Sequence, residues 1–308
     1  MVQQLKPLKL TFREECMKKG RIIKALSGFF YVQSDQSVIT CKGRGTLKKT
    51  GIIPVTGDWV KYTVVDELAK EGVIEQVLPR TNEMLRPPLA NLDQLMAVFS
   101  IKNPVPNLVL LDRILLRAEA QRFHASICFN KTDLVDEKEI GEHLSGYRKI
   151  GYPVFFVSTK SGEGMAELKE FLQGRTTALA GASGVGKSTI INSIYPEFQL
   201  KTGEISHKIQ RGKHTTRYTE LLSTEPDTWI ADTPGFSTLK ASDFDMEEIR
   251  FYFREFLHLQ DDCRFHSCLH LKEPGCSVKE AVYNGYIMQH RYENYKKIIE
   301  EIQSNRRY

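Results

Sequence analysis

Short runs of β-branched and aromatic residues alternate with glycines and polar residues along the first 80 positions of the chain. Such runs, bounded by turn-forming residues, are typical of β-strands. We expect five strands, at residues 20–25, 29–33, 37–41, 58–64 and 72–78. Five short strands in about 60 residues favour a small barrel of the oligonucleotide/oligosaccharide-binding (OB) type. An SH3-like barrel would give nearly the same pattern.

The pattern changes after residue 90. Apolar runs that predict buried strands, at residues 92–101, 125–129 and 153–157, alternate with predicted helices at 108–121, 136–148 and 164–172. This alternation predicts an α/β unit with a parallel sheet covered on both faces. Residues 79–82 and 86–89 indicate a linker in front of it. Beyond residue 240 we expect helices at 245–258 and 278–303.

The composition is that of a globular protein, with 41% hydrophobic and 26% charged residues. No apolar run approaches the roughly 18 residues of a membrane span. The first residues also lack the apolar core of a signal peptide. We therefore expect a cytoplasmic protein without membrane contact. In that compartment the six cysteines indicate thiols or metal ligands rather than disulfides.

Basic charge is concentrated at the start of the chain. Residues 1–80 contain 14 Lys and Arg against 8 Asp and Glu, whereas the net charge of the whole chain is +5. Localised basic charge favours a polyanion such as RNA, although a solvated basic surface explains it equally well. One loop holds the candidate phosphate contacts Lys42, Arg44, Lys48 and Lys49. The last predicted helix carries a second basic face, made of Arg291, Lys296, Lys297, Arg306 and Arg307.

A strand, a glycine loop and a helix follow one another around residue 181. The loop reads G-x-x-x-x-G-K-S and consists of Gly181, Ala182, Ser183, Gly184, Val185, Gly186, Lys187 and Ser188, followed by Thr189. Backbone N–H groups of such a loop surround a di- or triphosphate, and the helix N-terminus favours its negative charge. Lys187 would reach the β- and γ-phosphates, and Ser188 would bind Mg²⁺. The alternative is a glycine turn before a core helix.

A second motif, N-K-x-D, ends a predicted strand and consists of Asn130, Lys131, Thr132 and Asp133. The Asp133 carboxylate can accept hydrogen bonds from N1 and the 2-amino group of guanine, which adenine does not offer. Asn130 would brace the loop, and the Lys131 stem would lie along the base. Ser158 and Lys160 follow the next strand and would also contact the base. Alone, N-K-x-D could be a surface turn; beside a phosphate loop it predicts GTP binding.

The third motif, D-T-P-G, runs from Asp232 to Gly235. Asp232 would face Mg²⁺, generally through water, and the Gly235 N–H would bind the γ-phosphate. A basic loop at 203–217 precedes it. Within that loop Thr216, with Thr215 as the alternative, would bind Mg²⁺ only in the GTP state.

Three cysteines and a histidine near the C-terminus, Cys263, Cys268, His270 and Cys276, have the pattern C-x4-C-x-H-x5-C. Three thiolates and an imidazole form a tetrahedral zinc site that has no open position for water, so the ion would be structural. The spacing is not that of a common zinc finger. The segment is too short to bury a core of its own, so one zinc ion per chain would hold it together. His266 is the rival ligand, which we expect to face solvent.

The order of the motifs is unusual, because Asn130–Asp133 precede the phosphate loop instead of following it. With a barrel in front and a cysteine/histidine cluster behind, nearly the whole chain resembles the circularly permuted GTPases of the ribosome small subunit-dependent GTPase A (RsgA) family. The resemblance implies a cytoplasmic enzyme that hydrolyses GTP with Mg²⁺. It further implies binding to the small ribosomal subunit and its rRNA late in assembly, and stimulation of slow hydrolysis by that subunit. We expect a monomer.

Phe236 follows Gly235 at a position where many GTPases have a glutamine that orients the attacking water. Phenylalanine cannot hydrogen-bond water, so intrinsic hydrolysis should be slow. His214 is the nearest residue that could orient or deprotonate the water. A role for His214 as a ribosome-contacting loop residue fits the sequence equally well.

The sequence therefore predicts an OB-type RNA-binding barrel in 1–80, a circularly permuted GTPase domain in 81–240 and a helical zinc-binding domain in 241–308. In this order the loop at Gly235 leads directly into the last domain, so loss of the γ-phosphate could move that domain as a lever. One alternative is a GTP-dependent switch with a non-ribosomal RNA or protein partner. Another is a binding protein for which GTP is a structural ligand. A zinc enzyme is disfavoured, since the Cys3His set is closed to water.

Overall fold

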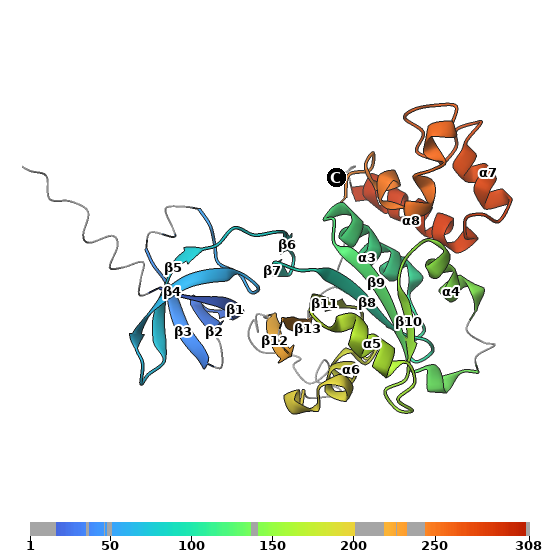
Figure 1. Cartoon of the computed structure of the whole chain (residues 1–308). Helices are drawn as coiled ribbons and strands as arrows, with labels where there is room; N and C mark the ends of the chain where they lie inside the picture. The colour runs from blue at the N-terminus through green and yellow to red at the C-terminus, as the bar shows by residue number, and fades with distance from the viewer. Residues whose placement is uncertain are drawn as a thin grey trace, which may run out of the picture.

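The computed structural model describes residues 17–34, 37–45, 47, 51–136, 141–200, 219–225, 227–232 and 244–305. Three parts follow one another along the chain: a small barrel, a sheet with helices on both faces, and a helical C-terminal part (Figure 1). The predicted multi-domain α/β architecture is confirmed. Among the described helices, none is both long and apolar enough to cross a membrane.

The barrel consists of β1 (Lys18–Leu26), β2 (Phe29–Ser34), β3 (Ser37–Gly43), β4 (Trp59–Asp66) and β5 (Glu71–Val77). Strand β1 pairs with both β2 and β4, which closes the barrel, and β3 runs parallel to β5. Its interior is filled by fully buried side chains that include Ile22, Val32, Cys41, Val60 and Ile74. The closed order with a parallel β3–β5 pair confirms the OB-type barrel over the SH3-like alternative.

Residues 79–90 include the linker predicted at 79–82 and 86–89, and they form an ordered connection between the barrel and the central sheet, in whose core Met84 and Leu89 are buried. Strands β6 (Glu83–Leu85) and β7 (Pro88–Ala90) form a hairpin. The Arg80 guanidinium donates to the two carboxylate oxygens of the buried Asp58 at 2.7 and 2.9 Å. The prolines of this stretch therefore belong to an ordered turn that is tied to the barrel by an ion pair.

The central sheet has the strand order β10-β9-β8-β11-β13-β12. Its strands are β8 (Gln94–Ser100), β9 (His124–Asn130), β10 (Val154–Val157), β11 (Thr176–Ala180), β12 (Glu220–Glu225) and β13 (Thr228–Asp232). All pairs are parallel except β12–β13. Strand β12 was not predicted, because its sequence, ELLSTE, has few apolar or β-branched residues.

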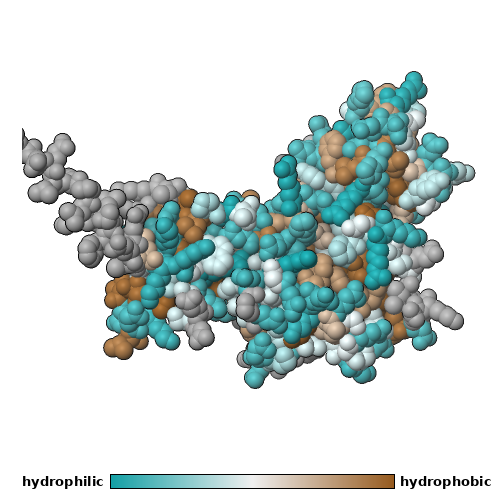
Figure 2. Space-filling model, viewed as in Figure 1, coloured by the Kyte–Doolittle hydropathy of each residue, from teal (hydrophilic) through white to brown (hydrophobic). Residues whose placement is uncertain are grey.

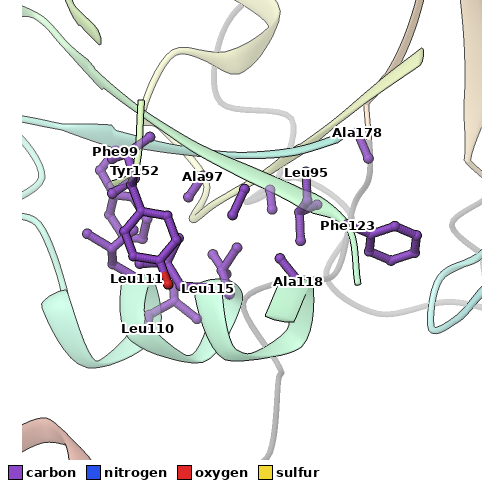
Figure 3. Close-up of a cluster of buried hydrophobic side chains, with 14 of the residues drawn as sticks. Leu95, Ala97, Phe99, Leu110, Leu111, Leu115, Ala118, Phe123, Tyr152 and Ala178 are labelled. Carbon is purple, nitrogen blue, oxygen red and sulfur yellow. The ribbon is translucent and has the colours of Figure 1, made fainter. Parts of the chain in front are cut away.

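Helices cover both faces of this sheet. On one face lie α3 (Leu108–Ala120) and α4 (Glu142–Lys149), and on the other lie α5 (Met165–Leu172) and α6 (Lys187–Ile194). Short 3₁₀ turns, η1 (Thr132–Leu134) and η3 (Pro196–Phe198), follow β9 and α6. Side chains of β8 alternate between the faces: Leu95, Ala97 and Phe99 belong to the core under α3 (Figure 3), and Met96 and Val98 to the core under α5 and α6. Complete burial of a leucine such as Leu111 or Leu115 of α3 stabilises the fold by about 1.5–3 kcal/mol.

The C-terminal part is less regular than predicted. Two 3₁₀ turns, η6 (Ile249–Tyr252) and η7 (Arg254–Phe256), occupy the region where a helix at 245–258 was expected, and a third, η8 (Gln260–Asp262), follows them. The predicted helix at 278–303 is two helices, α7 (Ser277–Tyr283) and α8 (Gln289–Asn305). Phe253 and Phe256 have helical spacing but stack on each other, with 5.0 Å between ring centroids. Their burial in a tertiary core, and not a helical stripe, explains the spacing.

Arg291 lies inside the molecule and not on a basic face of α8. Its side chain is 1% exposed and donates to Asp112 of α3 at 2.6 Å and to Glu255 of η7 at 2.7 and 3.0 Å. The prediction that Arg291 belongs to a basic face is therefore wrong, because its charge is paired with Asp112 and Glu255 inside the protein. Of the remaining basic residues of this helix, Lys296 pairs with Glu293 at 2.9 Å, Lys297 is exposed, and Arg306 and Arg307 lie outside the described residues.

Candidate nucleotide site and metal centre

The phosphate-loop sequence lies between β11 and α6. Gly181 follows β11 and Gly186 precedes α6. A Cβ added to Gly181 would lie 2.1 Å from the Val98 carbonyl oxygen, and one added to Gly186 would lie 2.2 Å from Nδ2 of Asn130. Both distances are far below van der Waals contact. The loop thus runs so close to the ends of β8 and β9 that glycine is required at both positions.

The Lys187 side chain folds back over this loop. Its amine donates to the carbonyl oxygens of Gly181 and Ala182 at 3.0 and 2.9 Å. The ammonium group therefore lies against the loop, on the side where the motif would hold phosphate oxygens. Ser188 is the next residue of α6. The arrangement fits a nucleotide phosphate group and the positive end of the helix dipole.

Asn130 and Lys131 join the N-K-x-D motif to the phosphate loop. The buried Asn130 donates through Nδ2 to the Val185 carbonyl at 3.0 Å, 55 positions along the chain. Its Oδ1 accepts the Lys131 N–H at 2.8 Å. Lys131 has a φ of +67°, and its amine donates to the Gly184 carbonyl at 2.9 Å and to the Asn103 carbonyl. The two motifs therefore form one surface, as a nucleotide site requires.

The Asp133 carboxylate is oriented by the loop after β10. Ser158 Oγ donates to Oδ1 of Asp133 at 2.7 Å and accepts the N–H groups of Lys160 and Ser161 at 3.2 and 3.1 Å. Lys160 is 84% exposed, and its amine lies 3.9 Å from Oδ2 of Asp133. A hydroxyl thus fixes the carboxylate, which retains acceptor capacity for the N–H groups of guanine. Thr132 donates to Glu163 at 3.3 Å and so supports the same turn.

Asp232 ends β13, where its backbone pairs with Leu179 of β11, two positions before the phosphate loop. The other residues of the predicted magnesium and water sites, His214, Thr215, Thr216, Gly235 and Phe236, lie outside the described residues. Their roles stay predictions. So does the part that Lys48 and Lys49 would play, for the same reason.

Cys263, Cys268, His270 and Cys276 form a buried cluster whose ligand atoms all lie within 4.8 Å of one another. Two sulfurs, of Cys263 and Cys276, are 3.9 Å apart, and they lie 3.6 and 3.4 Å from Nδ1 of His270. A tetrahedron with Zn–S of about 2.3 Å and Zn–N of about 2.0–2.1 Å needs separations of about 3.8 and 3.5 Å. The cluster therefore fits zinc, with Nδ1 as the imidazole ligand. His266 is exposed, as predicted.

Glu273 and two tyrosines hold the metal-binding loop, and the sequence analysis did not identify them. The Glu273 carboxylate accepts the N–H groups of Leu269 and Leu271 at 2.9 and 2.8 Å. Tyr292 and Tyr295 of α8 donate to the carbonyl oxygens of His270 and Leu269 at 2.6 and 2.7 Å. In the sequence, Glu273 lies between the metal ligands His270 and Cys276, and only this position could have indicated its role. The tyrosines come from a helix that is distant in sequence.

Burial sets the protonation of the metal-free cluster. It raises the pKa of the Cys276 thiol to about 12 and lowers the pKa of the His270 imidazole to about 4. Both groups are therefore neutral near pH 7 in the absence of metal. Zinc binding must displace thiol protons, so the apparent affinity for zinc rises with pH.

Comparisons with known proteins agree with this geometry. Residues 77–242 match the family model described as RsgA GTPase, and residues 19–74 match the RsgA N-terminal domain. A small ribosomal subunit biogenesis GTPase RsgA from Alkaliphilus metalliredigens is 48% identical over 292 residues, which cover 95% of this chain and 100% of the relative. The protein of the same name from Bacillus subtilis is 43% identical over 298 residues, with coverage of 94% and 99%.

Two solved structures have the same architecture. YloQ, described as a circularly permuted GTPase, has a TM-score of 0.76 and 39% identity, and the match covers 94% of this chain and 96% of that one. YjeQ from Thermotoga maritima has a TM-score of 0.79 and 36% identity, with coverage of 93% and 99%. Strands β8–β10 and the N-K-x-D motif precede the phosphate loop in this sheet, so the protein is a circularly permuted GTPase. It belongs to the RsgA GTPase family.

Proposed function

We propose that this GTPase acts in late maturation of the small ribosomal subunit, to which it binds through rRNA as a monomer in the cytoplasm. Hydrolysis is slow in the free protein and is stimulated by the subunit. The hydrogen bonds of Asn130 and Lys131, which join the base and phosphate motifs, support specific GTP binding. The names of the relatives supply the ribosomal partner. Residues 1–80, 81–240 and 241–308 are the proposed domains.

Each site residue has one proposed task. Asp133 accepts the guanine N–H groups, and Lys187 binds the β- and γ-phosphates. Mg²⁺, held by Ser188, by Thr216 and through water by Asp232, would supply charge neutralisation at the phosphates. The Gly235 N–H binds the γ-phosphate, and His214 orients the attacking water because Phe236 cannot. The Cys3His cluster holds one structural zinc ion.

GTP turnover with and without isolated small subunits tests the proposal. We expect slow turnover alone and clear stimulation by the subunit. Equal rates, together with no co-sedimentation of the protein with subunits in the presence of a GTP analogue, would exclude the ribosomal function. If the free protein hydrolyses GTP and loses this activity when Lys187 is replaced, it is a GTPase whether or not it binds the subunit.

The barrel provides the rRNA contacts in this proposal. The Lys42 amine lies 5.1 Å from the Phe29 ring centroid, whereas Arg44 forms an ion pair with Glu75. Figure 2 shows a concave, largely hydrophilic surface between the barrel and the C-terminal part.

Replacing Lys42, Arg44, Lys48 and Lys49 with glutamine should weaken subunit binding and flatten its salt dependence, because fewer counterions are released. Subunit binding equal to wild type at every salt concentration would contradict the role of the barrel. Glutamine at Lys149 and Lys169, on α4 and α5, gives the control.

Asp133 is the proposed guanine reader. Asp133→Asn should lower GTP affinity by about 10-fold or more, because one charged acceptor is lost. Xanthosine triphosphate should compete with GTP better than it does in wild type, since its 2-oxo group can accept a hydrogen bond from the asparagine side-chain amide. Fluorescent-nucleotide displacement measures both effects. Asp136→Asn, an exposed carboxylate three positions later, is the matched control. Unchanged preference for GTP in Asp133→Asn would rule out this assignment.

The zinc site makes a separate prediction. Metal analysis should find about one zinc per chain, and His270→Ala should lose it while His266→Ala retains it. Chelation should expose residues 263–276 to proteases but leave nucleotide binding intact, because the cluster packs in a different hydrophobic core from the one that contains Val185 of the phosphate loop. Freshly purified wild-type protein without zinc would disprove the structural metal site.

A further inference from the structure

The barrel and the central sheet meet at strands β1 and β12. Strand β1 pairs with β12 at Lys24 and Glu220, and the Lys24 amine lies 3.4 Å from Oε2 of Glu220. Glu220 lies opposite Asp232 on β13, and Asp232 lies opposite Leu179 on β11. One row of paired residues thus leads from the barrel across the sheet to Asp232. With about 4.8 Å between neighbouring strands, the backbones of Lys24 and Asp232 are about 10 Å apart.

A second contact fixes the start of β12. The Thr56 hydroxyl donates to the Thr219 carbonyl at 3.2 Å, and both residues are buried. Thr56 is itself held, because its carbonyl accepts the Ala90 N–H at 2.9 Å. The hydroxyl therefore links a fixed point of the barrel to the residue that precedes β12.

Arg21 of β1 secures the other end of the same junction. Its guanidinium donates to Thr176 Oγ1 at 2.9 Å and to the Asn91 carbonyl at 2.8 Å. It also lies between the rings of Trp59 and Trp229, 5.3 and 4.9 Å from their centroids. Thr176 begins β11, and Trp229 is in β13. The barrel thus contacts the strands that carry the phosphate loop and Asp232.

We propose that Thr56 and Lys24 are positioning residues for GTP hydrolysis: they set β12, and through it Asp232, so that binding of a partner to the barrel changes the hydrolysis rate. The inference rests on the proposed function for the identity of that partner. Among the described strands, β12 lies between β1 of the barrel and β13 of the central sheet. Movement of the barrel must therefore either move β12 or break the contacts of Thr56 and Lys24.

Thr56→Val tests the hydroxyl contact at nearly constant volume. We expect the stimulated turnover rate at saturating subunits to fall by about 5-fold or more, which is the usual range of coupling between sites. Subunit affinity should stay near wild type, and the ratio of stimulated to intrinsic turnover should fall. The melting temperature should fall by no more than a few degrees, because the buried Thr219 carbonyl loses one donor. Thr56→Ser, which retains the donor, should restore stimulation. Ser34→Ala is the control for loss of a hydroxyl, because Ser34 donates to the Lys19 carbonyl within the barrel at 3.0 Å and has no part in the junction.

Two variants of Lys24 test the ion pair with Glu220. Stimulation by the subunit should fall in Lys24→Met and persist in Lys24→Arg. Lys61 is an exposed lysine of β4, and Lys61→Met should behave as wild type. Full stimulation in both Thr56→Val and Lys24→Met would overturn the inference. So would a loss that disappears at saturating subunits, since the residues would then affect binding alone. If the wild-type protein is neither bound nor stimulated by subunits, the proposed function fails first, and this inference fails with it.

Discussion

Replacing Lys187 with alanine is expected to lower GTP turnover by a factor of about 10² or more, because one charged donor at the transferring phosphoryl group is lost. The Lys187 amine donates to the carbonyl oxygens of Gly181 and Ala182. Ala182 is partly exposed and the next two residues of the loop, Ser183 and Gly184, are exposed, so the cost in stability should be small. The defect should therefore be one of chemistry and phosphate binding.

Turnover by phosphate release, and the affinity for GTP and GDP, measure this effect. Ser188→Ala should likewise abolish Mg²⁺-dependent turnover. Lys149→Ala is the control, since this lysine is exposed at the end of α4 and is distant in sequence from the phosphate loop. The melting temperature of each variant should stay close to that of wild type. Turnover at the wild-type rate in Lys187→Ala would show that the glycine loop is only a structural turn.

The nucleotide site could be predicted from the sequence because each of its motifs is a short local run of residues. Gly181 to Ser188 and Asn130 to Asp133 are short runs in which residue type at fixed spacing is the chemical requirement. The barrel strands and the parallel sheet could be predicted from periodicity for the same reason. The circular permutation could be predicted only from the order of the motifs along the chain. The residue types within each motif do not show that order.

The errors arose where tertiary packing replaces local pattern. Phe253 and Phe256 have helical spacing, yet they lie in 3₁₀ turns around a shared aromatic core with Tyr295. Arginine is usually found on the surface, and the carboxylates of Asp112 and Glu255 compensate the charge of the buried Arg291. These partners come from α3 and η7, far away in the sequence. No local pattern could show that the three charges meet.

This buried network also bears on the lever that the motif order suggested. The C-terminal part packs on α3: Leu116 belongs to the same hydrophobic core as Ile298 and Ile302. Asp112 accepts Arg291 at 2.6 Å, Asn294 at 2.7 Å and the Tyr147 hydroxyl at 2.8 Å. A lever motion about the Gly235 loop would have to separate these groups. The C-terminal part should therefore move together with α3, if it moves at all.

Arg291→Ala is expected to destabilise the protein by about 3–5 kcal/mol, because it leaves the buried carboxylates of Asp112 and Glu255 without their countercharge. Removing the guanidinium also takes away its contact with the Phe253 ring, 4.6 Å from the centroid. Lys296→Ala, one turn further along α8, removes a surface partner of Glu293 and should cost less than about 1 kcal/mol. Urea unfolding followed by circular dichroism compares the two. Helix α6, which follows the phosphate loop, is on the opposite face of the sheet from α3, so nucleotide affinity at low temperature should be retained in Arg291→Ala. Equal stability of the two variants would mean that the Asp112–Arg291–Glu255 network does not hold the C-terminal part in place.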